Sequence, residues 1–264
     1  MNEYMMNSIA THAWHEFVYC KKNNDRKAFI DGMIESYPIK LDSGEPAMVY
    51  VSDFMLPEVE GFATPDKYRV SAAAREYLSF TLVAAMVEQT IRQNELEVLN
   101  EKLGKLIKDV NRLFLSNDDM EITSIESLRN ALVAGKNFYL ENYYRLMETG
   151  NWLGDFNTLP ISFIDYSSFV KTYKRALGIS SHFGMVLDYQ GSGAVVSQRA
   201  VNGLITKRIA GDSPIKVFSE PAEWKSYHDL GGMLAEDVHD YSSVDLDGSF
   251  KEHVMKLRLN NGIK

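Results

Sequence analysis

Long helices are the first feature that the hydrophobic pattern predicts. Apolar residues recur at three-to-four spacing over 25–37, and a helical pattern extends from Pro65 to about residue 115 and again over 124–150. Ser124 suits the start of the last segment and Gly150 its end. The short run 47–54 is rich in β-formers and predicts a strand between the first two helical segments.

The pattern changes after residue 158. Four runs are typical of strands: 159–166, 183–189, 214–220 and 242–248. Three runs between them are typical of helices: 167–178, 194–211 and 221–238. Strands separated by helices of this length indicate parallel strands with crossover helices on both faces. The sequence therefore predicts one α/β domain over 1–264. We expect a three-layer sandwich with about five mostly parallel strands and a helical insertion at about 66–150.

Composition narrows the function classes. The chain has 28 basic and 36 acidic residues, a net charge of −8, so it lacks a bulk electrostatic footprint for nucleic acid. The single cysteine, Cys20, excludes an intrachain disulfide and a cysteine-based zinc cluster. The longest apolar stretch, 79–87, is too short to span a bilayer, and the start has no secretory pattern. We expect a cytoplasmic protein with no membrane contact and no bound cofactor.

The apolar run "FGMVLD" raises the question of what its terminal Asp188 does, because "YQGSG" follows it directly. The order from 161 to 247 resembles the core of AAA+-type P-loop ATPases, especially bacterial helicase loaders and transposition helper ATPases. The resemblance implies that Asp188 takes the first acidic, Mg²⁺-binding position at a strand end. It also implies that Ser219 is the residue that senses the γ-phosphate. An aspartate that caps the glycine turn, and ordinary turn chemistry at Ser219, are the alternatives.

Several departures from the family predict that hydrolysis has been lost. The strand 47–52 is expected to enter the phosphate loop, but "SDFMLPEVEGFATPDKYRVS" follows it, with one glycine and no Gly-Lys-Ser/Thr. The Gly-Lys pair Gly135–Lys136 falls inside a helical pattern. Tyr189 stands where the family has a second acid, and 231–240 contains no arginine. The resemblance therefore implies an inactive adaptor or loader-like protein on a replication, mobile-element or phage-linked machine.

A second class of function rests on histidines and aspartates in "YHDLGGMLAEDVHDY". Imidazole and carboxylate groups suit Zn, Mn or Fe, so His228, Asp229 and His239 are candidate ligands of a metal-dependent phosphohydrolase. The alternative is that they are exposed polar residues at a helix end.

A third class is an interaction protein, oligomeric through its long helices and without nucleotide binding. Tyr139 and Tyr143 lie in the helical stretch 94–149 and are candidates for contacts with a protein partner, the alternative being a helical core. Basic residues leave open a local patch for single-stranded nucleic acid, the alternative and commoner case being isolated cations on solvated helix faces. They are Lys174, Arg175, Lys207 and Arg208.

Overall fold

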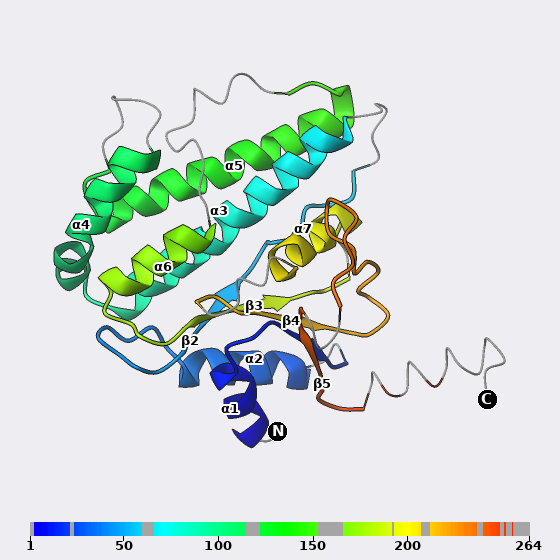
Figure 1. Ribbon diagram of the computed structural model, residues 1–264, viewed down its shortest axis with the longest axis horizontal. Helices are drawn as coiled ribbons and strands as arrows, with labels where there is room; N and C mark the ends of the chain where they lie inside the picture. The colour runs from blue at the N-terminus through cyan, green and yellow to red at the C-terminus, as the bar shows by residue number, and fades with distance from the viewer. Residues whose placement is uncertain are drawn as a thin grey trace.

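The computed structural model describes the chain as a parallel sheet with helices on both faces (Figure 1). The described residues are 3–21, 24–59, 66–114, 122–152, 166–191, 193–206, 212–236, 240–248, 251 and 255. The strands are β1 (Glu16–Tyr19), β2 (Ala47–Val51), β3 (Phe183–Asp188), β4 (Ile215–Ser219) and β5 (Ser242–Asp245). They lie in the order β2-β3-β4-β1-β5, and each neighbouring pair is parallel. The predicted α/β class with a five-stranded sheet is therefore confirmed.

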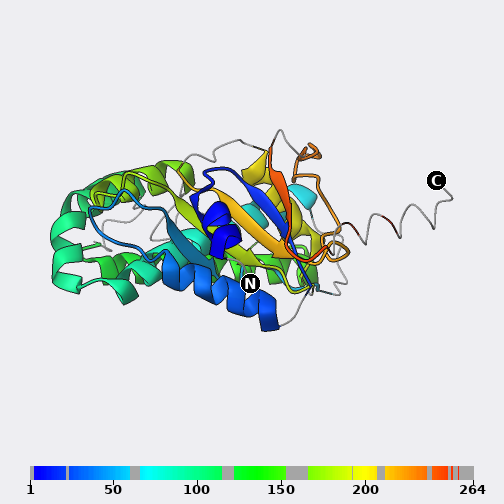
Figure 2. The ribbon, with the colours of Figure 1, turned by 90° about the horizontal axis from the view of Figure 1, so that it is seen from below.

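The described helices form two unequal layers. They are α1 (Glu3–Thr11), α2 (Asn24–Ser36), α3 (Lys67–Gln93), α4 (Leu96–Phe114), α5 (Ile125–Thr149), α6 (Tyr166–Ala176) and α7 (Val195–Ile205). The two N-terminal helices cover one face of the sheet, and α3, α6 and α7 cover the other, with α5 packed on α3 (Figure 1). Figure 2, viewed from the side of α1 and α2, shows α2 running beside β2.

Most predicted elements are found, and two predictions are corrected. The first strand is β1, which the sequence analysis did not predict. The described part of 221–238 contains no helix but a series of turns. The strand predicted at 159–166 falls on residues outside the described part, apart from Tyr166, which begins α6. The caps of α5 are as predicted, since Ser124 and Ser127 form a capping box and Gly150 ends the helix at φ 73°.

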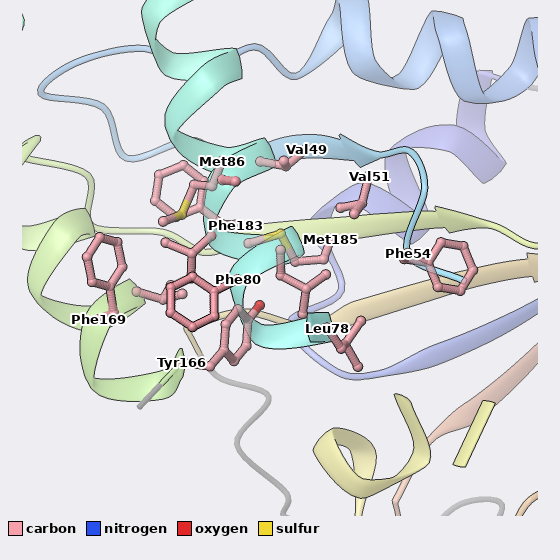
Figure 3. Close-up of a cluster of buried hydrophobic side chains, with 14 of the residues drawn as sticks. Val49, Val51, Phe54, Leu78, Phe80, Met86, Tyr166, Phe169, Phe183 and Met185 are labelled. Atoms are coloured by element: carbon pink, nitrogen blue, oxygen red, sulfur yellow. The ribbon is translucent and has the colours of Figure 1, made fainter. Parts of the chain in front are cut away.

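The larger hydrophobic core lies between the sheet and α3, α5, α6 and α7. Figure 3 shows part of it, where Phe80 of α3 meets Phe183 and Met185 of β3 and Phe169 of α6. The smaller core lies on the opposite face, where Val186 and Phe218 pack against Phe29 and neighbouring residues of α1 and α2. Alternate residues of β1, β2, β3 and β4 thus contribute to the two cores, as expected for a sheet covered on both faces.

Helix α3 is the central helix of the larger layer and contacts α5, α6, α7 and β2. Among the described helices it is the one that is long and apolar enough to cross a membrane, but 72% of its most apolar window is buried inside the molecule. Its Phe80 ring lies so close to Gly135 of α5 that an added Cβ would come within 2.3 Å of a ring carbon. Gly135 therefore serves helix packing, and the Gly135–Lys136 pair is not part of a phosphate loop.

A buried ion pair fixes the amino-terminal edge of the sheet. Lys216 of β4 is fully buried, and its Nζ donates to Glu16 Oε2 at 2.6 Å and to the carbonyl oxygens of His12 and Trp14 at 2.7 and 2.9 Å. Burial lowers the pKa of Lys216, and the facing Glu16 carboxylate opposes that shift. The three acceptors explain how a lysine is accommodated in the middle of a buried strand.

His15 and His182 are buried near this ion pair. The backbone N–H of Ile215 donates to His15 Nδ1 at 3.0 Å, and His182 Nε2 donates to the Ala10 carbonyl at 3.0 Å. Burial, reinforced by Lys216, lowers the pKa of His15 to about 3, and burial lowers the pKa of His182 to about 4. Both histidines are therefore neutral in the folded protein at neutral pH.

The first prediction tests the assignment of β3 as an interior strand. Val186 is fully buried, so Val186→Asp places an unpaired charge in the smaller core and should abolish soluble expression. The matched control is Ser243→Asp, at an exposed position of β5, which should express normally. Expression of both variants as folded protein, judged by circular dichroism, would contradict the assignment.

The second prediction concerns acid stability. In the unfolded chain, His15 and His182 bind a proton below about pH 6.5, whereas in the folded chain they do so only near pH 3–4. The free energy of unfolding should therefore fall as the pH is lowered from about 6.5, by up to about 1.4 kcal/mol per pH unit for each of the two histidines. It should reach its full value above pH 6.5.

Urea titrations at pH 7, 6 and 5 test this dependence. His15→Asn keeps an acceptor for the Ile215 N–H but cannot titrate, so its stability should fall less steeply with acid. His228→Gln, at an exposed position, is the control and should keep the wild-type slope. An unchanged slope in His15→Asn would show that His15 does not contribute.

Candidate functional site

The carboxyl ends of β1, β3 and β4 lie at one edge of the sheet, where Asp188 is held by an arginine that the sequence analysis missed. Arg26 Nη2 lies 3.1 Å from Asp188 Oδ1 and donates to the Tyr189 carbonyl at 3.2 Å. The Arg26 and Asp188 side chains are 2% and 8% exposed. The predicted acidic residue is thus a strand-end aspartate, but its charge is already neutralised by the protein itself.

Helix α2 positions Arg26 beneath the sheet. The residue lies in the first turn, and Phe29, Ile30 and Met33 follow it at helical spacing on the same buried face. This spacing is the signal that could have identified Arg26, because an arginine in an apolar stripe requires a buried partner. The guanidinium also neighbours Cys20 at the end of β1, where burial raises the pKa of the Cys20 thiol to about 12 and Arg26 opposes the shift.

Ser219, predicted to act with Asp188, lies on the opposite face of the sheet. Residues alternate between faces along a strand, so Ser219 shares its face with Val217 of the larger core, whereas Asp188 is paired in register with Phe218 of the smaller one. The Ser219 hydroxyl is buried and has no hydrogen-bond partner among the described residues. The adjacency of β3 and β4 therefore does not bring these two side chains into one site.

Tyr189 is fully buried and serves packing at this edge. Its ring lies 5.3 Å from that of Trp224, edge to face, and its backbone N–H donates to the Phe218 carbonyl at 2.8 Å. Burial raises the pKa of Tyr189, and Glu223 and Glu58 raise it further. An aromatic anchor thus occupies the position where the resemblance calls for a second metal-binding acid.

A cavity of about 320 Å³ opens at the carboxyl ends of β2 and β3. Its lining includes Ser52, Asp53, Asp188 and Gln190, and its two charged lining residues, Asp53 and Asp188, are acidic. Asp53 has φ 53°, in the left-handed region that non-glycine residues seldom adopt. The Tyr77 hydroxyl donates to the Asp53 carbonyl, which holds this conformation in place.

The loop after β4 is fixed by polar side chains of α7. Gln198 Oε1 accepts from the backbone N–H groups of Lys225 and Ser226 at 2.9 and 3.1 Å, and Asn202 Nδ2 donates to the carbonyl oxygens of Ser226 and His228 at 2.7 and 3.0 Å. These contacts satisfy backbone groups that a helix would have paired internally. They explain why a segment predicted to be helical is irregular instead.

The proposed metal ligands are placed in part by this loop. Asp229 Oδ1 accepts from the N–H groups of Gly231 and Met233 at 2.9 and 2.7 Å, so it stabilises a tight turn. His228 is exposed, and His239 lies outside the described residues. Within the described part of the chain, no three His, Cys, Asp or Glu side chains are grouped so as to hold a metal ion.

The two tyrosines predicted to face a partner are core residues. Tyr139 and Tyr143 are 0% and 1% exposed. The Tyr139 ring packs on Phe80 at 5.5 Å, and the Tyr143 hydroxyl donates to the Pro57 carbonyl at 3.0 Å. The prediction of an exposed interface at these positions is wrong, because both side chains are buried where α5 packs on α3 and on the loop that follows β2.

The predicted basic patch is also reduced. Lys174 is 11% exposed and forms an ion pair with Asp212 at 2.6 Å, so it is engaged within the protein. Arg175 is exposed at the end of α6. Lys207 and Arg208 lie outside the described residues.

The residues at this edge do not fit a nucleotide. The segment that links β1 to α2, 20–23, has the sequence Cys-Lys-Lys-Asn and contains no glycine to wrap a phosphate with backbone N–H groups. The carboxylate of Asp188 faces the Arg26 guanidinium rather than an open position. A metal-bound triphosphate would therefore find neither a glycine cradle for its phosphates nor a free Asp188 carboxylate for its metal ion at this edge.

Comparison of the chain with models of protein families, with curated proteins and with solved structures finds no match.

The third prediction tests the Arg26–Asp188 pair as a structural unit. Arg26→Met should lower the free energy of unfolding by about 3–5 kcal/mol, because it leaves the Asp188 carboxylate buried without its counter-charge. Asp188→Asn should cost a similar amount by isolating Arg26. The double variant should recover much of the loss, which denaturant titration measures as a coupling energy.

Single variants that each stay within about 0.5 kcal/mol of wild type would contradict this role. Glu45→Gln, which removes the exposed ion pair between Lys40 and Glu45, is the control and should change stability little.

Proposed function

We propose that this chain is a catalytically inactive, AAA+-like protein that works in the cytoplasm as an adaptor or loader-like factor, through macromolecular contacts. The observation that carries the proposal is the buried Arg26–Asp188 ion pair at the carboxyl edge of the sheet. In the resemblance drawn from the sequence, this edge binds Mg²⁺ and phosphate. Here the Arg26 side chain provides the positive charge that Mg²⁺ would otherwise supply.

The arrangement of the sheet supports this reading. The resemblance requires the strand that ends in Asp188 to lie inside the sheet and beside 47–51, and β3 lies between β2 and β4. The first strand of the sheet is β1, not the strand at 47–52 that was expected to lead into the phosphate loop. The phosphate loop of the resemblance would therefore fall at 20–23, between β1 and α2. That segment departs from the family pattern even more than 53–71 does, since it has no glycine at all.

The losses all concern nucleotide chemistry and leave the fold intact. Tyr189 and Arg26 are buried, well-packed replacements, which is what a scaffold retained for binding requires. A protein that keeps such a scaffold without a phosphate loop is suited to hold another macromolecule, and its acidic balance favours a protein partner over a nucleic acid.

The fourth prediction is that Mg²⁺-ATP binds more weakly than about 1 mM, measured by calorimetry on the wild-type protein. No ATP turnover should be detected, and Asp188→Asn should change stability without changing that result. Micromolar binding of ATP, with turnover that Asp188→Asn abolishes, would overturn the proposal. A known ATPase measured in the same buffer provides the positive control.

A further inference from the structure

The β2 edge of the sheet carries backbone groups that face away from the other strands. The backbone N–H and C=O groups of Ala47, Val49 and Val51 point toward β3, so those of Met48, Tyr50 and Ser52 point outward. An edge of this kind is a template for another strand unless the protein covers it. Here the protein covers the edge only as far as the Tyr50 N–H.

The side chain of Gln89 in α3 covers the first part of the edge. Its Nε2 donates to the Met48 carbonyl at 2.7 Å, and its Oε1 accepts from the Tyr50 N–H at 3.1 Å. One residue of a parallel strand placed opposite Val49 would make the same two hydrogen bonds with its own N–H and C=O. Gln89 therefore takes the place of one residue of a sixth strand, parallel to β2.

The next position along the edge is open. A residue opposite Val51 would donate to the Tyr50 carbonyl and accept from the Ser52 N–H, and no described residue makes either bond. An antiparallel strand would instead pair with both the N–H and the C=O of Tyr50, and Gln89 already occupies that N–H. With Gln89 in place, the open Tyr50 carbonyl and Ser52 N–H match the pattern of a parallel segment.

A hollow of about 410 Å³ lies over this edge, between α2 and α3. Tyr50 and Ser52 line it, and they also line the cavity at the carboxyl ends of β2 and β3, so the two hollows adjoin. The Tyr50 side chain is 39% exposed and therefore accessible from this side. An extended segment laid along β2 would thus have room where its backbone could form the ladder.

The charges around Tyr50 define the chemistry of the occupant. Asp31 and Glu35 of α2 line the hollow, whereas Glu88 of α3 is already paired with Arg92 at 2.5 Å. Burial raises the pKa of Tyr50, and the carboxylates of Asp188, Asp31 and Asp53 raise it further, with Arg26 opposing them. The α2 side of the edge is therefore negative and complements lysine or arginine side chains.

We propose that the β2 edge between α2 and α3 binds an extended basic segment of a protein partner, which joins the sheet as a sixth strand parallel to β2. The segment places one small apolar residue opposite Val51, facing α3. It places basic residues on either side of that residue, facing Asp31 and Glu35. The proposal extends the adaptor function above by naming its docking surface, and it requires no nucleotide.

The test uses the peptide Lys-Val-Lys-Thr, labelled at its carboxyl end for fluorescence anisotropy, with the whole chain. Its first lysine lies opposite Tyr50, so no peptide residue competes with Gln89 for the place opposite Val49. Binding is expected, together with slower hydrogen exchange of the Ser52 amide in the complex. Methylation of the valine nitrogen removes the donor to the Tyr50 carbonyl and should weaken binding about tenfold. Glutamate in place of both lysines should abolish binding.

Protein variants separate the edge from general electrostatic attraction. Asp31→Asn with Glu35→Gln should weaken binding of the lysine peptide. Glu126→Gln with Glu141→Gln removes the same charge from exposed positions of α5 and should leave binding unchanged. Thermal melts of both double variants establish that each is folded.

Several outcomes would overturn the proposal: no binding, equal binding of the methylated or glutamate peptide, or unchanged exchange at Ser52. None of them bears on nucleotide affinity. If the peptide binds and ATP also binds tightly, the docking surface stands and the inactive-ATPase function falls. If neither binds, the function stands and the docking surface falls.

Discussion

The buried ion pair between Arg26 and Asp188 is the contact on which the carboxyl edge of the sheet depends. It joins the first turn of α2 to the end of β3. In the sheet, β4 lies between β3 and β1, the strand that precedes α2. Two charges removed from water require each other, so neither residue can change alone without leaving the other uncompensated. The same contact that secures α2 against the sheet also uses the charge of the carboxylate that a metal ion would need.

The position of α2 links this interaction to the open side of the molecule. Because Arg26 holds the start of the helix beneath the sheet, Asp31 and Glu35 follow along the β2 edge. Helix α3 bounds the same edge from the other face and contributes Gln89. The hollow beside Asp31 and Glu35 and the exposed stretch of β2 are therefore consequences of how the two helices are anchored. The proposed docking surface depends on the same contacts as the stability of the fold.

The sequence was informative wherever local pattern and tertiary packing agree. The long periodic helices, the caps of α5 and the apolar strand β3 were all predicted, because each burial pattern matches one regular period. The strand β1 was not, since Glu16 at its start becomes acceptable only through Lys216. Tyr139 and Tyr143 were misplaced because periodicity locates a helix face but not what covers it. Asp188 could be found at its strand end, whereas its pairing with Arg26 depends on a contact 162 positions away in the chain.

The location of β1 within the sheet has a consequence for how the protein is made. This strand lies between β4 and β5, and its register pairs Glu16 with Lys216 and with Ser242. During synthesis the amino-terminal residues leave the ribosome long before either neighbour exists, so β1 must wait with its hydrogen-bonding groups and apolar side chains unpaired. Such sequence-distant pairing slows folding and exposes the nascent chain to aggregation. The middle of the chain, where α3 and α5 pack together, can form first, and closure of the sheet around β1 is then a late event in folding.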